Sequence, residues 1–418
     1  MRNQDRKPKY EPIAVRWKPL RLVFLVLAAG SMLLPSTAMA SDNDINIQFN
    51  KGLQGSTEDG NFKFKFGGRI MWDTAYYSAD SGLEAALGST FEDGSEFRRS
   101  RLYISGTIYK NVIFEAQYDF AGGDADFKDV YVGIKGLPFI GTLKAGHFKE
   151  PFSLENLTSS KYISLMERNA NNDVFVHGRN SGLGFQNTMA DERGTYAFGV
   201  FKDAGAFGDS VCDNRNFTGR VTGLPWKGEN GDLLHVGAGA SLRKPCSDTV
   251  SFSARPESYL AEKVLSTGSI TSDDYEIYNV ELALVFGPAS LQGEYFLTEL
   301  DTGGASDPDL HGHYVEATWW LTGESRKYNK SAGAFSRTSP NNNFAPDGAG
   351  WGGWQLAARY TGVDLSDIAG QELKVLTFGV NWHLNPNARV MVNYGWGDRD
   401  DLADGEVDIF QTRVQIDF

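Results

Sequence analysis

The sequence has little cysteine and proline, and it lacks any hydrophobic run long enough for a membrane-spanning helix. Of its 418 residues, two are cysteine and 14 are proline. A membrane-spanning helix needs about 20 apolar residues, and the apolar run at 22–34 is shorter than that. No later stretch is long enough either. What the chain does have is 47 glycines and 13% aromatic residues, a composition that indicates a large β protein with tight turns.

The first forty residues have the pattern of a secretory signal peptide. A basic stretch precedes the apolar run, and Ala38-Met39-Ala40 before Ser41 forms a small-x-small cleavage site. An uncleaved inner-membrane anchor is the alternative. Without residues 1–40 the chain has 33 Lys and Arg against 51 Asp and Glu, a formal charge of −18. So acidic a protein is not expected to bind nucleic acid.

The two cysteines, Cys212 and Cys246, both fall in predicted loops. In an oxidising compartment they can pair and tie the two loops together, and the alternative is two unpaired thiols. We predict neither a catalytic nor a metal-binding role for them.

Alternation of apolar and polar residues runs through the chain from Phe62 onward. In the last segment Phe410, Val414, Ile416 and Phe418 share one parity, and polar residues occupy the other. This is the pattern of a strand with one apolar and one wet face. Ending on an aromatic residue resembles the closing strand of bacterial outer-membrane barrels. About sixteen such segments begin near residues 62, 97, 112, 127, 141, 182, 195, 217, 233, 275, 289, 311, 354, 372, 388 and 410.

These segments predict an all-β fold, a transmembrane antiparallel β-barrel over residues 62–418, preceded by an N-terminal periplasmic segment at 41–61. Short connections alternate with longer polar ones, as in barrels with tight periplasmic turns and longer outer loops. The long segment 323–350 falls on the periplasmic side by this parity and is an exception. A soluble all-β protein also alternates, but no fixed-period repeat indicates a propeller or solenoid.

The connection at 149–178 is too long for a turn, and its mixture of aromatic and apolar residues argues against disorder. We call it the constriction loop, because after the fifth strand of a sixteen-stranded barrel it is expected to pack inside the lumen and narrow the pore.

Several motifs together resemble the phosphate-selective porin O and P family. They are Phe97-Arg98-Arg99-Ser100-Arg101-Leu102, Tyr118-Asp119, Thr158-Ser159-Ser160-Lys161, Glu167-Arg168-Asn169 and Leu321-Thr322-Gly323-Glu324. The resemblance runs from about residue 62 to residue 418. It implies a sixteen-stranded outer-membrane barrel of a Gram-negative bacterium, a homotrimer, whose third outer loop folds inward and carries part of an anion-binding constriction.

The resemblance also assigns site residues. The paired arginines are Arg98 and Arg99, and the constriction acid is Asp119. The serine-lysine run of the inward loop and the arginine after it are Ser159, Ser160, Lys161 and Arg168. Arginine offers a fork of donors to phosphate oxygens, lysine a compact charge and serine a neutral donor. Alternation separately places Arg99 and Arg101 on the polar, lumen-facing side, whereas Arg98 falls on the other parity. Pairing of these arginines with acids on the next strand is the alternative.

Two departures from the family weaken the expected phosphate selectivity. Asn156 occupies the position of an additional lysine, and no ladder of arginines is found. The polar positions of the later strands instead carry Glu281, Glu294 and Glu316. We therefore predict a porin for small hydrophilic solutes that prefers anions such as phosphate, with a weakly selective or cation-preferring porin as the alternative. An enzyme is not expected, because no G-x-S-x-G elbow is present, and no cofactor is predicted.

Overall fold

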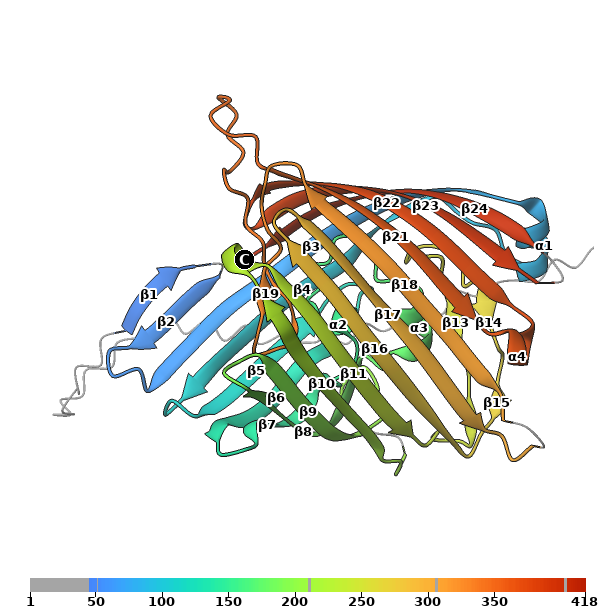
Figure 1. Cartoon of the computed structure of the whole chain (residues 1–418), viewed down its shortest axis with the longest axis horizontal. Helices are drawn as coiled ribbons and strands as arrows, with labels where there is room; N and C mark the ends of the chain where they lie inside the picture. The colour runs from blue at the N-terminus through green and yellow to red at the C-terminus, as the bar shows by residue number, and fades with distance from the viewer. Residues whose placement is uncertain (1–44, 51, 210–211, 305–306, 402–403) are drawn as a thin grey trace, which may run out of the picture. The chain divides into compact units, whose positions relative to one another are not determined.

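The computed structural model describes residues 45–50, 52–209, 212–304, 307–401 and 404–418. These residues form one compact unit, a closed antiparallel barrel of sixteen strands (Figure 1). Each predicted segment start lies within five residues of an observed strand start, so the predicted barrel is confirmed. The predicted signal peptide lies outside the described residues.

The barrel strands follow one another around the wall in chain order. They are β3 (Phe62–Ala79), β4 (Gly94–Ile108), β5 (Val112–Asp119), β6 (Asp126–Leu137), β7 (Gly141–Lys149), β8 (Arg179–Met189), β9 (Gly194–Lys202), β10 (Asn216–Lys227), β11 (Leu233–Arg243), β16 (Asp274–Phe286), β17 (Ala289–Asp301), β18 (Asp309–Trp320), β21 (Gly353–Asp364), β22 (Glu372–Asn385), β23 (Ala388–Asp400) and β24 (Gly405–Asp417).

The remaining, smaller elements are not strands of the closed barrel. They are the strands β1 (Ile45–Phe49), β2 (Leu53–Thr57), β12 (Thr249–Val250), β13 (Ser253–Ala254), β14 (Leu265–Ser266), β15 (Ile270–Thr271), β19 (Tyr328–Asn329) and β20 (Ala334–Phe335), and the helices α1 (Ser81–Leu87), α2 (Leu154–Leu157), α3 (Asn171–Phe175), α4 (Ser366–Ala369) and the 3-10 turn η1 (Glu229–Gly231).

The barrel closes where β24 pairs with β3. Asp417 lies opposite Arg69, and the last residue, Phe418, exchanges backbone hydrogen bonds with Gly68. In β24 the polar residues Gln411 and Arg413 are buried in the lumen, as alternation predicts. The polar parity of the strands is thus hidden inside the barrel.

The hairpin of β1 and β2 extends the sheet beyond the closed barrel. β2 pairs with the first residues of β3, from Lys63 to Phe66. Only the part of β3 from Arg69 onward pairs with the closing strand. The segment predicted as N-terminal and periplasmic therefore includes two strands.

Short turns join strands at one end of the barrel and longer loops join them at the other, as predicted. The exception is the connection predicted as 323–350, which spans 321–352 in the structure and lies at the short-turn end (Figure 1). Part of this segment enters the lumen, where the carbonyl oxygen of Gly333 accepts a hydrogen bond of 2.7 Å from Arg220. The backbone N–H of Phe335 donates to Thr158 of the constriction loop over 3.3 Å.

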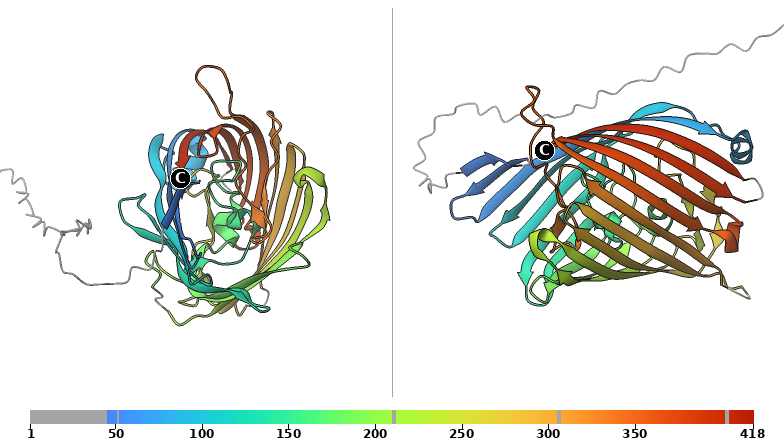
Figure 2. Two further views of the ribbon diagram at one scale, coloured as in Figure 1. Left: turned by 90° about the vertical axis from the view of Figure 1, so that its left-hand side faces the viewer. Right: turned by 45° about the horizontal axis from the view of Figure 1, so that its top comes forward.

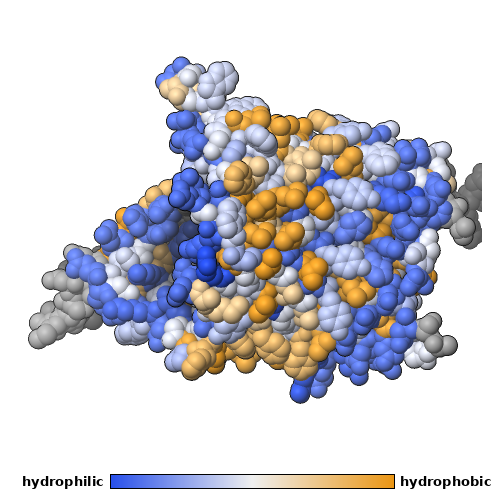
Figure 3. Space-filling view, viewed as in Figure 1, coloured by the Kyte–Doolittle hydropathy of each residue, from blue (hydrophilic) through white to orange (hydrophobic). Residues whose placement is uncertain are grey.

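Apolar side chains gather on the outer wall over β16 to β18 (Figure 3). Val280, Leu282, Val315 and Trp319 are among those that are half exposed there. Among the described residues, the helices are all too short or too polar to span a membrane.

Candidate functional site

The constriction loop lies inside the ring of strands (Figure 2, left). Its apolar residues pack against the inner face of strands on one side of the barrel. Phe175 of α3 stacks on Phe296 of β17 with ring centroids 5.7 Å apart. Gly312 of β18 allows this close approach, because a Cβ atom there would lie 1.9 Å from Asn171 Oδ1. Hydrophobic packing thus fixes the loop to the β16–β22 wall.

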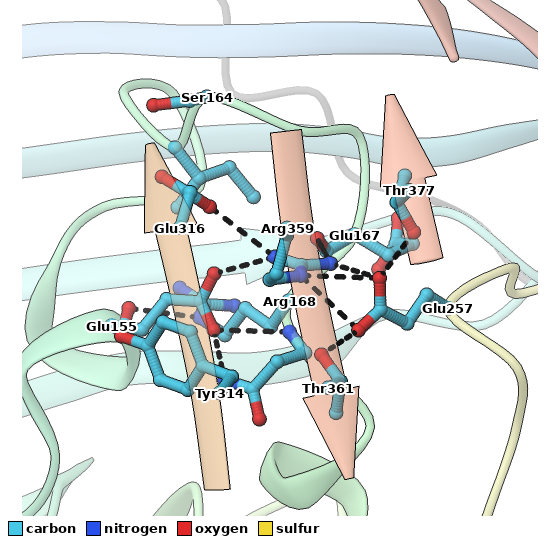
Figure 4. Close-up of polar contacts among 12 residues, drawn as sticks. Glu155, Ser164, Glu167, Arg168, Glu257, Tyr314, Glu316, Arg359, Thr361 and Thr377 are labelled. Carbon is cyan, nitrogen blue, oxygen red and sulfur yellow. Dashed lines mark hydrogen bonds and ion pairs between the residues drawn. The ribbon is translucent and has the colours of Figure 1, made fainter. Parts of the chain in front are cut away.

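Arg359 of β21 anchors the loop by charge (Figure 4). Its guanidinium donates to Glu155 over 3.0 Å and to Glu316 over 3.4 Å. It also donates to Glu257, which comes from the outer loop 244–273. One buried arginine therefore joins the barrel wall to two inward loops.

The lumen glutamates Glu281 and Glu294, which argued against a strong anion preference, also accept networks of hydrogen bonds. Glu281 accepts two hydrogen bonds from Arg220, at 2.8 and 2.7 Å. Glu294 accepts from the backbone N–H groups of Leu154 and Glu155, and from three side chains besides. Glu294 thus holds the constriction loop in place on the packed side of the lumen, whereas Glu281 is paired with Arg220 of the wall.

The open part of the lumen is a cavity of about 510 Å³ on the opposite side, which we call the main cavity. Its described lining comes from β3 to β8 and the constriction loop. The lining residues are Lys65, Arg69, Arg99, Arg101, Tyr103, Ser105, Glu115, Gln117, Asp129, Lys149, Asn156, Leu157, Ser159, Ser160, Lys161, Tyr162, Arg168, Asn172, Gly178 and Arg179.

The charge of this lining is strongly positive. Eight lysines and arginines face two carboxylates, a formal balance of six positive charges among the described lining residues. Three further acids approach the lining from outside. Asp119 lies 2.6 Å from Arg101, Glu167 lies 3.6 Å from Arg99, and Asp417 lies 3.8 Å from Lys161. Even with these, three positive charges remain, so the main cavity attracts anions although the whole chain is acidic.

Six of the eight predicted constriction residues lie together in this lining. They are Arg99, Arg101, Ser159, Ser160, Lys161 and Arg168. Arg168 donates three hydrogen bonds to carbonyl oxygens of its own loop, which fix the loop's shape. Burial lowers the pKa of Lys161 to about 7 and that of Arg168 to about 10. Asn156, the position without the family's lysine, also lines the cavity.

Arg98 lies elsewhere, because β4 contains a β-bulge. Met71 pairs with Arg99 and Trp72 with Phe97, so Arg98 is the extra residue and its side chain leaves the outward parity. Its guanidinium forms two hydrogen bonds of 2.9 Å with Glu167 of the constriction loop and covers the ring of Tyr259. Burial would raise the pKa of Glu167, but the nearby arginines hold it well below its usual range.

Asp119 is also outside the cavity lining. It accepts hydrogen bonds from Arg101 over 2.6 Å and from the backbone N–H of Ser100 over 3.0 Å. The cross-strand pairing considered as the alternative thus describes Arg101 and Asp119. Arg99 instead lies 3.6 Å from Glu167 of the constriction loop and donates to the sulfur of Met71 over 3.7 Å. Arg99 is 4% exposed, and its Nε is buried without a partner in the described parts of the chain.

Four cationic residues of the lining were not predicted as site residues: Lys65, Arg69, Lys149 and Arg179. Arg69 of β3 donates to Ser160 over 2.8 Å. Lys149 ends β7 and donates to the carbonyl oxygen of Asn156. Arg179 begins β8 and pairs with Asp129 at 2.6 Å. Arg69 follows the lumen-facing parity of β3, whereas Lys149 and Arg179 stand at strand ends, where parity gives no direction.

We predict that Arg98→Gln leaves the anion preference of the pore within about twofold of the unmodified protein. Arg98 is paired with Glu167 outside the cavity, and Arg413 also holds that carboxylate at 2.7 Å, so the loss of Arg98 should leave the lining side chains in place. Reversal potentials in a salt gradient measure this. If Arg98→Gln lost as much anion preference as an Arg99 variant, the placement of Arg98 outside the main cavity would be contradicted.

Cys212 and Cys246 are joined in a disulfide, with Cα atoms 5.6 Å apart. The bond links loop 203–215 to the base of loop 244–273. The first of these loops reaches β6, where Ala206 accepts a backbone hydrogen bond from Phe127. The second carries Glu257 to Arg359. The disulfide therefore connects a loop that contacts β6 to the loop that supplies Glu257.

Comparison with known proteins agrees with this architecture. The family described as phosphate-selective porin O and P matches residues 64–418. Porin O of Pseudomonas aeruginosa is 28% identical over 94% of this chain and 97% of its own length. Among solved structures, the anion-selective porin from Comamonas acidovorans is similar with a TM-score of 0.54, 14% identity and coverage of 85% of this chain and all of that one.

A second similar structure is a trimer form of OmpT from Vibrio cholerae, with a TM-score of 0.54, 14% identity and coverage of 85% of this chain and 99% of that one. At such low identity these structures support the fold alone. The family match spans most of the chain, from the start of the barrel to its last residue. The chain therefore belongs to the phosphate-selective porin O and P family and is a β-barrel porin of the Gram-negative outer membrane.

Proposed function

We propose that this porin carries out passive, downhill diffusion of small hydrophilic solutes and prefers inorganic anions such as phosphate. The observation that carries this proposal is the lining of the main cavity, with eight cationic side chains and two carboxylates. Fixed cations in a narrow, partly dehydrated passage attract anions and repel cations. Screening by salt, with a range of about 8 Å at physiological ionic strength, weakens the effect.

In this proposal the lining replaces part of the hydration shell of the anion. Arg99, Lys161 and Arg168 supply charge, and Ser159 and Ser160 offer neutral donors. Conduction also requires release. We assign to Asp119 an indirect part in release, because it neutralises Arg101 instead of facing the ion.

A weakly selective porin remains the second candidate, favoured by Asn156 in place of the family's lysine. A cation-preferring pore is less well supported, because the acids on which it rests are paired with arginines or, for Glu294, hydrogen-bonded to the constriction loop. Glu281 lies with Arg220 and Glu316 with Arg359, on the packed side of the lumen. Block of the chloride current by inorganic phosphate in planar bilayers decides between selective and weakly selective pores.

We also propose a homotrimer in outer-membrane lipid, in keeping with the trimer form of the similar OmpT structure. Cross-linking in outer membranes would give a three-chain species. We assign the protein no catalytic role, since its family and fold are those of a channel. Within the described residues, no group of three or more metal-ligating side chains is close enough to hold an ion.

The anion preference should fall as pH rises through about 7. The pKa of Lys161 is lowered by burial to about 7, so its ammonium is charged below that pH and neutral above it. We expect sulfate, whose charge is constant in this range, to block less well at about pH 8.5 than at about pH 6. Lys161→Arg keeps its charge throughout and should abolish the pH dependence. If sulfate block in Lys161→Arg depended on pH as it does in the unmodified protein, the role of Lys161 would be contradicted.

Recordings of single channels in KCl test the proposed function directly. Conducting steps that phosphate blocks at concentrations well below that of the chloride would support it. An absence of conducting steps would refute the channel function, and conduction without phosphate block would leave the weakly selective candidate.

A further inference from the structure

A second, smaller pocket lies on the other side of the constriction loop, near the short-turn end. It has a volume of about 30 Å³, and we call it the side pocket. The 321–352 segment covers it, and β18 and β21 to β24 form its wall. Its lining residues are Lys161, Tyr162, Trp320, Arg326, Ser336, Arg337, Thr338, Gln355, His383, Asn385, Pro386, Asn387, Ala388, Arg389, Gln415 and Asp417.

The side pocket has an excess of positive charge. Four cationic side chains line it, Lys161, Arg326, Arg337 and Arg389, against a single described carboxylate, Asp417. That carboxylate already pairs with Arg337 and lies 3.8 Å from Lys161. Arg326 also lies 3.8 Å from Glu316, which is outside the lining and is shared with Arg359. The four buried cations thus still outnumber their two carboxylate partners, which is costly unless a further anion compensates them.

The pocket wall also holds a buried donor without a partner. Trp320 is 2% exposed, and its indole Nε1 has no hydrogen-bond partner among the described residues. His383, whose ring centroid lies 4.7 Å from that of Trp320, likewise has a buried, unpartnered Nε2 in the described structure. Leaving a buried N–H unsatisfied is costly, so such a donor indicates a bound acceptor.

The volume limits what the acceptor can be. A space of about 30 Å³ holds roughly one or two particles of the size of a water molecule. A monatomic anion fits this space, whereas the main cavity, at about 510 Å³, accepts much larger ions.

From these observations we propose that the side pocket binds a single halide-sized inorganic anion. The anion accepts a hydrogen bond from Trp320 Nε1 and compensates the surrounding arginines. Arg326 and Arg337 belong to the 321–352 segment, while Trp320 and Arg389 belong to the barrel wall. The anion therefore holds the inner part of this segment against the wall. This site goes beyond the proposed permeation function and does not depend on it.

The experiment is X-ray diffraction at the bromine absorption edge, from crystals of the whole protein grown with bromide as the only halide. We expect an anomalous peak in the side pocket next to Trp320 Nε1. Bromide in the main cavity serves as a control that the ion entered the crystal. A peak in the main cavity alone, with bound water only in the side pocket, would overturn the proposal.

Two variants test the assigned donor. Trp320→Phe removes the N–H and keeps an aromatic ring, and it should reduce bromide occupancy in the side pocket at least about threefold. Trp354→Phe is the matched control, because the indole of Trp354 donates to Trp351 over 3.3 Å outside this pocket. Unchanged occupancy in Trp320→Phe would contradict the proposal. If that variant fails to fold, Arg326→Gln provides the same comparison, since it removes one lining cation.

Discussion

The double variant Arg99→Ala with Lys161→Ala should lose most of the anion preference of the pore. Arg99 lies 3.6 Å from Glu167, which two other arginines already share. The ammonium of Lys161 lies 3.8 Å from Asp417, beyond hydrogen-bonding distance. Both charges are thus only partly compensated and act on an anion in the main cavity. At about 4 Å and an effective dielectric constant of about 20, one unit charge contributes roughly 4 kcal/mol before losses of hydration.

We therefore expect phosphate block to weaken at least about tenfold, which corresponds to roughly 1.4 kcal/mol. The measurement is the phosphate concentration that halves the chloride current through single channels. Lys374→Ala is the matched control, because it removes a cation that pairs with Glu372 and Asp400 on the outer wall. Equal phosphate block in the double variant and in this control would contradict the assigned site.

Arg359→Ala should destabilise the barrel and widen its passage. The side chain is 1% exposed and joins Glu155, Glu257 and Glu316, so its loss leaves three buried carboxylates without this partner. Removing one partner of a buried ion pair typically costs about 3–5 kcal/mol. The constriction loop and loop 244–273 both lose an anchor, and we expect single-channel conductance to rise.

The temperature at which the folded band disappears in heat-modifiability gels measures the stability, and bilayer recordings measure the conductance. Arg359→Lys keeps the charge but not the fork of donors. Its stability and its conductance should therefore lie between those of the unmodified protein and those of Arg359→Ala. An alanine variant with unchanged stability and conductance would show that the loop is held by its apolar contacts alone.

Much of the fold could be predicted because lipid and lumen impose alternation on every strand. In β24, Phe410 and Val414 face outward while Gln411 and Arg413 face inward, and the period of two records this directly. The β-bulge at Arg98 could not be predicted in the same way, since one inserted residue reverses parity without changing composition. The entry of the 321–352 segment into the lumen was also missed, because its length alone does not give a direction.

The candidate site could be predicted less completely, because charge in a lumen depends on which residues pair. Arg220 meets Glu281 across 61 residues of sequence, and Arg359 meets Glu155 across 204. Neither separation leaves a local pattern. The acidic residues of the later strands therefore suggested a less anion-selective pore than the observed lining supports. The family motif placed Lys161 and Arg168 in the lining, where alternation could not, since loops have no fixed period.

The reversal potential of the unmodified porin in a KCl gradient is the most direct test of the central claim. Because the main cavity has an excess of cationic side chains, chloride should carry most of the current and set the sign of the potential. A reversal potential of the opposite sign, with potassium carrying most of the current, would contradict the proposed anion preference.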